Sequence, residues 1–112
     1  KEEEPSEQEI FEVVEEAAEF PGGMPACLQF LYKNIKYPTI AQENGTQGQV
    51  VLQFVVERDG SITDIRVVKS VDPYLDKEAL RVVKTMPKWK PGKQRGKPVR
   101  CRFTLPVRFR LQ

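Results

Sequence analysis

The side chains that usually perform catalysis near neutral pH are scarce in this chain. It contains no histidine, which removes the usual general base at this pH and the commonest metal ligand. Its two cysteines, Cys27 and Cys101, are too far apart in the sequence for a CxxC redox or metal motif. The glycines at 22–23 and 45–48 lack the spacing of a phosphate-binding loop. We therefore expect no catalytic residue, no metal site, no cofactor and no enzyme activity.

The chemistry that the sequence does offer is main-chain hydrogen bonding along its last strand. Apolar and polar residues alternate over residues 100–111, which predicts a strand with one buried and one exposed face. The even positions carry Arg100, Arg102, Thr104, Pro106, Arg108 and Arg110. Because proline has no amide hydrogen, Pro106 favours a sheet edge with its nitrogen on the open side. The amides of the neighbouring even-numbered residues would face the same side, where an extended peptide can be added as a further strand.

The elements that must hold this strand begin with a short strand and a helix. Residues 10–14 resemble a short strand, and a Pro-Gly-Gly turn follows at 21–23. Residues 24–35 are predicted to form a helix that ends before Pro38. Its apolar stripe consists of Leu28, Leu31, Tyr32 and Ile35. Residues 39–48 resemble a short turn of helix followed by a bend.

A hairpin and a second helix come next. Residues 49–57 and 62–70 alternate as strands, and Asp59-Gly60 between them is a strong turn signal. Asp72 can cap the following helix, and Pro73 suits its first turn. The apolar face of this helix consists of Leu75, Ala79, Val82, Val83 and Met86.

These elements predict an α+β fold of two layers. If the last strand lies beside residues 49–57, the strand order is 62–70, 49–57, 100–111, with antiparallel neighbours and the last strand at an edge. We expect a three-stranded antiparallel sheet with two helices on one face, plus a short N-terminal strand. Residues 1–20 are expected to be an acidic linker end with that strand, and residues 21–112 the folded domain.

The uneven charge leaves other functions open. Residues 1–20 hold nine acids and one base, and the remaining 92 residues hold seven acids and seventeen bases. Such a basic part can bind nucleic acid or another anionic polymer, although we favour a solvated surface. Lysines and arginines surround Trp89, but a lone tryptophan between a helix end and a turn is typical of a core. A structural module that dimerises through its last strand is a third interpretation.

The two cysteines admit two interpretations. Cys101 lies on the apolar side of its strand, where a small buried hydrophobic residue is expected. Cys27 falls in the first predicted helix. A disulfide between them stays open if that helix crosses the sheet near Cys101.

A series of short motifs carries a family resemblance. In order they are Phe20-Pro-Gly-Gly-Met24, Ile35-Lys-Tyr-Pro38, Ala41-Gln42, Gly48-Gln-Val50, Val55-Val-Glu-Arg-Asp-Gly60, Leu75-Asp-Lys-Glu-Ala79, Pro87-Lys-Trp-Lys-Pro-Gly92 and Thr104-Leu-Pro-Val-Arg-Phe109. In sequence and spacing, about ninety residues from Pro21 onward closely resemble the C-terminal domain of the TonB energy transducers. The first motif is similar to the variant common in Bacteroides-type bacteria.

The resemblance implies a periplasmic domain of a protein anchored in the inner membrane by an N-terminal helix outside this sequence. In that family an inner-membrane motor, ExbB–ExbD, draws on the proton gradient. The transducer carries the work to outer-membrane receptors for iron complexes, cobalamin, glycans or other nutrients. Each receptor presents a short extended segment, the TonB box, ahead of its plug. This segment is added as a strand beside the last strand of the domain, and a homodimer of the domain stays open.

Carried onto this sequence, the resemblance makes residues 99–109 the docking strand. The segment from Tyr37 to Gln42 matches the part of the family that lies near the receptor peptide. The residues implied for receptor-peptide binding are Val99, Arg100, Arg102, Thr104, Val107, Arg108, Phe109, Arg110, Tyr37, Pro38 and Gln42.

Overall fold

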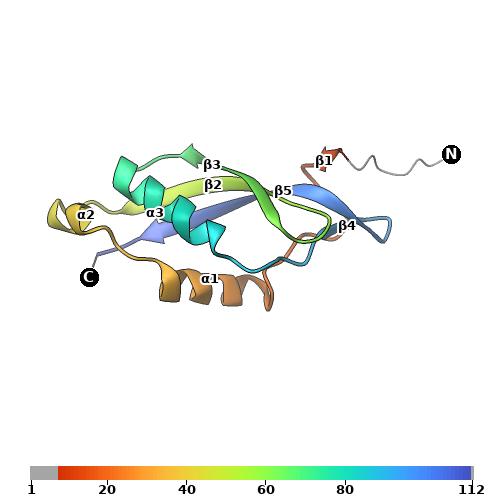
Figure 1. Cartoon of the computed structure of the whole chain (residues 1–112), viewed down its shortest axis with the longest axis horizontal. Coiled ribbons are helices and arrows are strands. Elements are labelled where there is room, and N and C mark those ends of the chain that lie inside the picture. The colour runs from red at the N-terminus through yellow and green to blue at the C-terminus, as the bar shows by residue number, and fades with distance from the viewer. Residues whose placement is uncertain (1–7, 112) are drawn as a thin grey trace.

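The computed structural model describes residues 8–111, which form one mixed sheet with helices beside it (Figure 1). The elements are β1 (Ile10–Phe11), α1 (Gly23–Asn34), α2 (Thr39–Glu43), β2 (Gly48–Val56), β3 (Ile62–Lys69), α3 (Pro73–Lys84), β4 (Gly92–Gln94) and β5 (Lys97–Phe109). The predicted linker character of residues 1–7 lies outside the described residues. The boundary at residue 21 between the linker end and the folded domain stays a prediction.

The centre of the sheet has the predicted arrangement. The strands follow the order β1-β5-β2-β3, and β2 is antiparallel to both of its neighbours. The pairing of β2 with β5 is uninterrupted from Gly48 opposite Phe109 to Val56 opposite Cys101. The predicted order of the three long strands, β5-β2-β3, is therefore confirmed. The odd-numbered apolar side chains of β5 point toward the core.

The prediction of a purely antiparallel sheet of three strands was wrong. β1 pairs in parallel with β5, with Ile10 opposite Arg100 and Phe11 opposite Cys101. β4 forms a tight hairpin with the start of β5 through Arg95 and Gly96, whose φ angles are 53° and 76°. Positive φ at both central residues is the geometry of a type I′ turn. The short strand predicted at residues 10–14 is present as β1, although it is limited to Ile10–Phe11. β4, with three residues, is too short to leave a periodic signal and was not predicted.

Helix α3 forms the layer that covers the sheet. The Asp72 side chain accepts a hydrogen bond from the Leu75 amide at 2.7 Å, and Pro73 is the first residue of the helix, as predicted. The buried face consists of Leu75, Glu78, Ala79, Val82 and Val83. Opposite it lie the inward side chains of β2, which are Val50, Leu52, Phe54 and Val56. The apolar face predicted for this helix is thus confirmed except at Met86, which lies beyond the end of the helix and is only partly buried.

Trp89 lies in the core, as expected from its position after a helix end. Its side chain is 3% exposed, and its ring contacts Phe54 and Phe103 at centroid distances of 5.4 and 4.8 Å. The Trp89 amide donates to the Gly60 carbonyl at 2.8 Å, which ties the β2–β3 hairpin to the segment after α3. Gly60 has a φ of 90°, as a turn residue of this hairpin requires.

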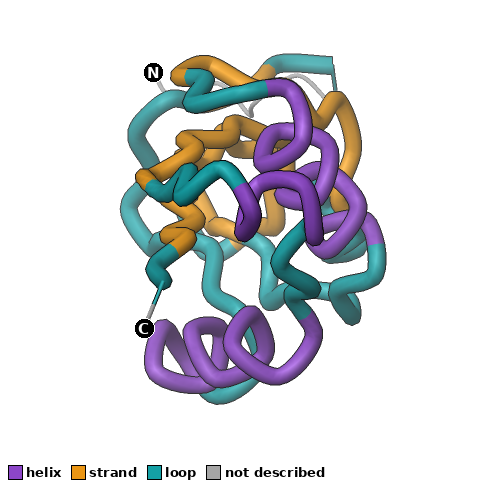
Figure 2. Tube along the Cα trace, turned by 90° about the vertical axis from the view of Figure 1, so that its left-hand side faces the viewer, coloured by secondary structure: helices purple, strands orange, loops and turns teal. Residues whose placement is uncertain are grey.

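Helix α1 departs from the expectation that both helices cover the same face. Figure 2 shows α3 beside the strands and α1 set apart from them. Only Cys27 and Leu31 are buried in α1, whereas Leu28 and Tyr32 of the predicted stripe are 54% and 82% exposed. Helical periodicity shows that a stripe exists, but it does not show whether another element covers the stripe. The exposed part of the stripe, Leu28 and Tyr32, therefore lies on the surface, whereas Leu31 belongs to the core.

The segment before α1 belongs to the fold. After β1 it runs antiparallel to residues 90–93, with isolated bridges from Glu16 to Lys93 and from Glu19 to Lys90. Ala18 and Phe20 are buried.

Both cysteines are free and buried. Burial raises the pKa of the Cys27 thiol to about 11 and also raises that of Cys101, so both are weak nucleophiles.

Candidate functional site: an open strand edge beside an apolar groove

Among the described residues, strands other than β2 pair with β5 only near its beginning. β4 pairs with Lys97 to Val99, and β1 pairs with Arg100 and Cys101 on the side away from β2. Beyond this point β2 continues along one side to Phe109. Within residues 8–111, the other side of β5 has no strand partner after Cys101. The predicted edge is therefore present, but it is shorter than β5 itself.

The position of Pro106 identifies the backbone groups on this edge. Pro106 lies opposite Val51 and has no amide hydrogen to donate to β2. Paired residues of antiparallel strands alternate between hydrogen-bonded and non-hydrogen-bonded positions, so a proline fits the second kind. The backbone groups of even-numbered residues then point away from β2. Thr104 and Arg108 therefore present both an amide and a carbonyl to the open side.

The opposite margin of the sheet, β3, is less suited to accept a strand. Its pairing with β2 shifts register between Val51 and Leu52 and again between Gln53 and Val55. Asp64 has a φ of 51°, which is strained for a residue with a side chain. Such bulges interrupt the regular row of donors and acceptors that a guest strand needs.

An apolar groove of about 690 Å³ lies between α1 and the end of β5. From the strand side it is lined by Pro106, Val107, Arg108, Phe109 and Arg110. From the helix side it is lined by Leu28, Leu31, Tyr32, Ile35 and Tyr37, and Gln49 completes it. The exposed stripe of α1 thus faces the open edge, and a strand added to β5 would place alternate side chains in this groove.

A buried carboxylate fixes the connection between α1 and α2 that forms one wall of the groove. Glu78 is 8% exposed and accepts hydrogen bonds from the Lys36 amide at 2.6 Å and from Arg81 Nε at 2.8 Å. Arg81 also donates to the Asn34 carbonyl at 2.9 Å. Burial by itself raises the pKa of Glu78, but the hydrogen bonds from Arg81 and Lys36 outweigh it and hold that pKa below its ordinary value.

Tyr37 lies within this connection and closes one end of the groove. Its ring meets Phe109 edge to face at a centroid distance of 5.6 Å, and its hydroxyl donates to the Thr46 carbonyl. Burial, followed by the nearby Asp72 carboxylate, raises the pKa of Tyr37, so the hydroxyl stays a donor. The aromatic pair therefore holds the end of β5 against the α1–α2 connection.

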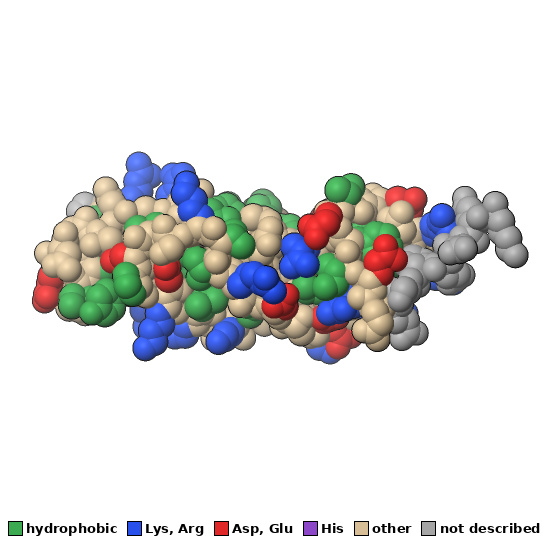
Figure 3. Space-filling view, turned by 90° about the horizontal axis from the view of Figure 1, so that it is seen from above, with side chains coloured by type: hydrophobic (Ala, Val, Ile, Leu, Met, Phe, Trp, Pro, Cys, Tyr) green, Lys and Arg blue, Asp and Glu red, His purple; other side chains and the backbone are tan. Residues whose placement is uncertain are grey.

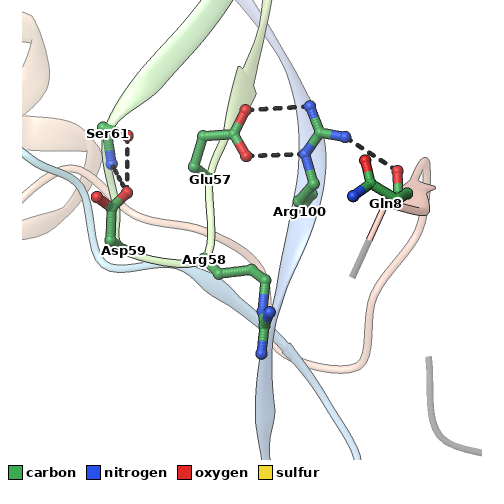
Figure 4. A pocket seen from close by; sticks show the side chains of 6 residues that line it. All are labelled: Gln8, Glu57, Arg58, Asp59, Ser61 and Arg100. Atoms are coloured by element: carbon green, nitrogen blue, oxygen red, sulfur yellow. Dashed lines mark hydrogen bonds and ion pairs between the residues drawn. The ribbon is translucent and has the colours of Figure 1, made fainter. Parts of the chain in front are cut away.

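The arginines of β5 are not equivalent. Arg100 donates to Glu57 at 2.7 Å and to the Gln8 carbonyl at 2.9 Å, as Figure 4 shows, and Arg102 donates to Glu12 at 2.9 Å. The hydrogen bond from Arg100 is the main cause of the lowered pKa of Glu57. Arg108 donates to the Gln49 amide oxygen at 3.4 Å. Within the described residues, neither Arg108 nor Arg110 forms an ion pair, so positive charge is available at the groove.

The site residues predicted from the sequence fall into three groups. Tyr37, Val107, Arg108, Phe109 and Arg110 line the groove. Arg102 and Thr104 lie on the edge next to it, whereas Val99 and Arg100 lie where β4 and β1 are paired. Pro38 and Gln42, at the start of and within α2, do not line the groove.

Sequence reasoning did not assign Leu28, Tyr32 and Ile35 to the site. The apolar stripe of the predicted helix contained these residues, but the stripe was assigned to the core.

No helix among residues 8–111 is both long and apolar enough to cross a bilayer. The same residues contain no group of three or more histidine, cysteine or acidic side chains placed to hold a metal ion.

Together these features define an α+β domain whose last strand keeps an open edge beside an apolar groove. The chain belongs to the TonB C-terminal family, because the family model described as "Gram-negative bacterial TonB protein C-terminal" matches residues 33–111.

Known relatives agree with this assignment. The protein TonB of two Helicobacter pylori strains is 43% identical over 51 residues, which are 45% of this chain and 18% of that protein. The solution structure of the H. pylori TonB C-terminal domain superposes with a TM-score of 0.59 at 27% identity, covering 76% of this chain and 78% of that one. For the Pseudomonas aeruginosa domain the TM-score is 0.50 at 28% identity, with 69% and 80% covered. The chain spans less than a fifth of the curated relatives that it matches.

Proposed function

We propose that this chain is the periplasmic domain of a TonB-type energy transducer and docks the TonB box of outer-membrane receptors by strand addition. The observation that carries the proposal is the open edge of β5 from Thr104 onward, next to the apolar groove, in a chain of the TonB C-terminal family. The receptor segment lies beside β5 and extends the sheet by one strand. Work derived from the proton gradient then passes through this strand pair to the receptor plug and drives nutrient uptake.

The energy of docking suits an energy transducer, which must bind the receptor segment and then release it. Each main-chain hydrogen bond contributes about 0.5–1.5 kcal/mol net, and the edge offers few of them because Pro106 donates none. Main-chain pairing accepts many guest sequences, whereas the groove between Tyr32 and Phe109 selects their side chains. Arg108 and Arg110 favour a guest with a carboxylate at that end.

Other parts of the parent protein would supply the membrane anchor and the contact with the motor. An N-terminal helix that anchors it in the inner membrane and contacts the ExbB–ExbD motor would precede this domain in the parent. These partners and the periplasmic location rest on the family, since the chain covers 18% of its curated relatives.

The charge distribution weighs against a nucleic-acid binder as the main function. Figure 3 shows acidic side chains among the lysines and arginines of one face rather than a continuous basic surface. Several arginines are already paired, as in Arg66–Asp64, Arg81–Glu78 and Arg100–Glu57. Nucleic-acid binding draws on cations that are free to meet phosphates.

An NMR titration tests the docking proposal. The probes are synthetic peptides that copy the N-terminal segments of the outer-membrane receptors encoded in the same genome, with scrambled peptides as controls. We expect cognate peptides to shift the amide signals of Thr104, Arg108 and Arg110 and the ring signals of Tyr37. If every receptor peptide leaves β5 unmoved at saturating concentration, the docking proposal is wrong.

A further inference from the structure

The chain already occupies one end of the edge that the proposed function assigns to a guest. Ile10 and Phe11 pair in parallel with Arg100 and Cys101, on the side of β5 away from β2. A guest strand on the same side cannot pair with Arg100 while β1 is in place. The N-terminal segment therefore takes part in defining the site, although it lies far from β5 in the sequence.

Side-chain contacts hold residues 8–12 next to Arg100 and Arg102 of β5. Arg100 binds the Gln8 carbonyl and Arg102 binds the Glu12 carboxylate, at 2.9 Å in each case. Glu57, which directly follows β2, orients Arg100, because its carboxylate accepts hydrogen bonds from the Arg100 guanidinium at 2.7 and 3.1 Å. The carboxylate of Glu12 thus lies at the boundary between the covered and the open parts of β5.

The chain then leaves the edge at once. Val13 is 84% exposed, and from Glu15 onward the segment pairs with the β4 region instead. Glu16 forms a bridge with Lys93, which lies opposite Pro98, so the chain has moved from the edge of β5 to the β4 hairpin within a few residues. The coverage of the edge consequently ends sharply near Arg102 instead of fading along the strand.

We propose that residues Ile10 to Glu12 act as a register stop that determines where a guest strand begins on β5. This proposal rests on the docking function proposed above. With β1 in place, Thr104 is the first residue beyond the Arg102–Glu12 pair that offers both an amide and a carbonyl. A slip of one residue would turn every side chain of the guest to the opposite face. By closing the edge at Arg102, β1 keeps the apolar side chains of the guest in phase with the groove.

Hydrogen exchange of the full chain without peptide gives the first test. The outward amide of Arg100 should be protected by β1, whereas those of Thr104 and Arg108 should exchange freely. Glu12→Lys places two cations together and should speed exchange at Arg100 by about tenfold. Glu9→Lys makes the same charge change nearby and should leave Arg100 unchanged.

A second variant pair covers the case in which Glu12→Lys alone does not release β1. Phe11→Pro and Phe11→Ala both remove the ring, but only proline removes the amide. Greater exposure of the Arg100 amide in the proline variant is expected. Equal exchange in the two Phe11 variants, together with no effect of Glu12→Lys, would overturn the register stop.

A series of peptide lengths tests the consequence for docking. The probe is the receptor N-terminal peptide that produces the largest shifts in the titration described above, synthesised at five to eleven residues. In the native chain, affinity should level off at about seven residues, the span from Thr104 to Arg110. In Glu12→Lys, longer peptides should gain about threefold more affinity and shift the Arg100 amide.

The outcomes separate the two proposals. If a long peptide shifts Arg100 as strongly as Thr104 in the native chain, the register stop is rejected and docking stands. If no receptor peptide perturbs β5, docking fails and the register stop fails with it.

Discussion

At the scale of single residues, Pro106, Arg108 and Arg110 determine what the open edge offers to a guest. Pro106 opposite Val51 places the even-numbered backbone groups of β5 on the open side. Arg108 and Arg110 keep their charges available, because within residues 8–111 the acidic partners go to Arg100 and Arg102. Pattern reading from the sequence identified the edge and its proline, since both follow from alternation. It could not tell which arginines would be neutralised, because Glu12 and Glu57 are far away in the sequence.

The exposed tyrosine of α1 provides a prediction about recognition. Tyr32 is 82% exposed, so Tyr32→Ser should change the free energy of unfolding by less than about 0.5 kcal/mol. The same change should weaken binding of a receptor peptide several-fold, because the ring lines the groove. Tyr74→Ser is the matched control, since Tyr74 is 48% exposed on α3 and is not among the groove residues. Calorimetric titration and chemical unfolding of both variants measure the two effects, and equal losses of affinity would contradict the assignment of the groove.

The buried carboxylate of Glu78 provides a prediction about stability. Glu78→Ala leaves the Lys36 amide without its acceptor and removes the carboxylate partner of the Arg81 guanidinium. We expect a loss of about 1–3 kcal/mol in the free energy of unfolding, measured by urea denaturation. Arg66→Ala serves as the control, because it breaks a solvent-exposed ion pair with Asp64 and should have little effect.

At the scale of elements, the long strands, α3 and the presence of a short N-terminal strand could be predicted, whereas β4, the parallel pairing of β1 and the place of α1 could not. β2, β3 and β5 repeat their pattern over eight to thirteen residues, and α3 has a cap, a proline and a continuous apolar face. β1 and β4 have no such repeat. The stripe of α1 indicated a helix correctly, but an apolar face looks the same in a sequence whether it faces a core or a binding groove.

The turn between β2 and β3 provides a second prediction about stability. A Cβ atom at Gly60 would lie 2.0 Å from the Trp89 carbonyl oxygen, and φ there is 90°. Gly96 also has a positive φ, but nothing lies within 4 Å of its Cβ position. Gly96→Ala should therefore cost about 1–2 kcal/mol from backbone strain alone, and Gly60→Ala clearly more. Thermal unfolding of the two variants compares them, and equal losses would show that the contact with Trp89 is unimportant.

The edge of β5 provides a prediction about pairing. Thr104→Pro removes an outward amide that a guest strand would use, whereas Thr104→Ala keeps it. Both variants lose the hydrogen bond between the Thr104 hydroxyl and Gln53, so this contact cancels in the comparison. We expect receptor-peptide affinity to fall about three- to tenfold further in the proline variant, in line with the loss of one hydrogen bond. Equal affinities in the two variants would argue against main-chain pairing at this residue.

At the scale of the whole molecule, acid should weaken the fold. The pKa values of Glu57 and Glu78 are both held below their ordinary values in the folded state. A carboxyl group with a lowered folded-state pKa contributes stability above its unfolded pKa, and this contribution is lost as the pH falls through the folded value. The free energy of unfolding should therefore decrease below about pH 4.3, the ordinary value for glutamate. Denaturation curves at several pH values check this, and Glu78→Ala should show a weaker dependence.

The central claim is that β5, and not the opposite edge β3, receives the receptor segment. Both strands end the regular part of the sheet, but β5 pairs with β2 in an unbroken register and adjoins the apolar groove of about 690 Å³, whereas the register of β3 is interrupted. Hydrogen exchange of the complex with a receptor N-terminal peptide, read residue by residue, tests this most directly. We predict that the amides of Thr104 and Arg108 exchange at least about tenfold more slowly in the complex, while those of β3 do not change. Protection of β3, or a bound peptide that protects neither strand, would contradict it.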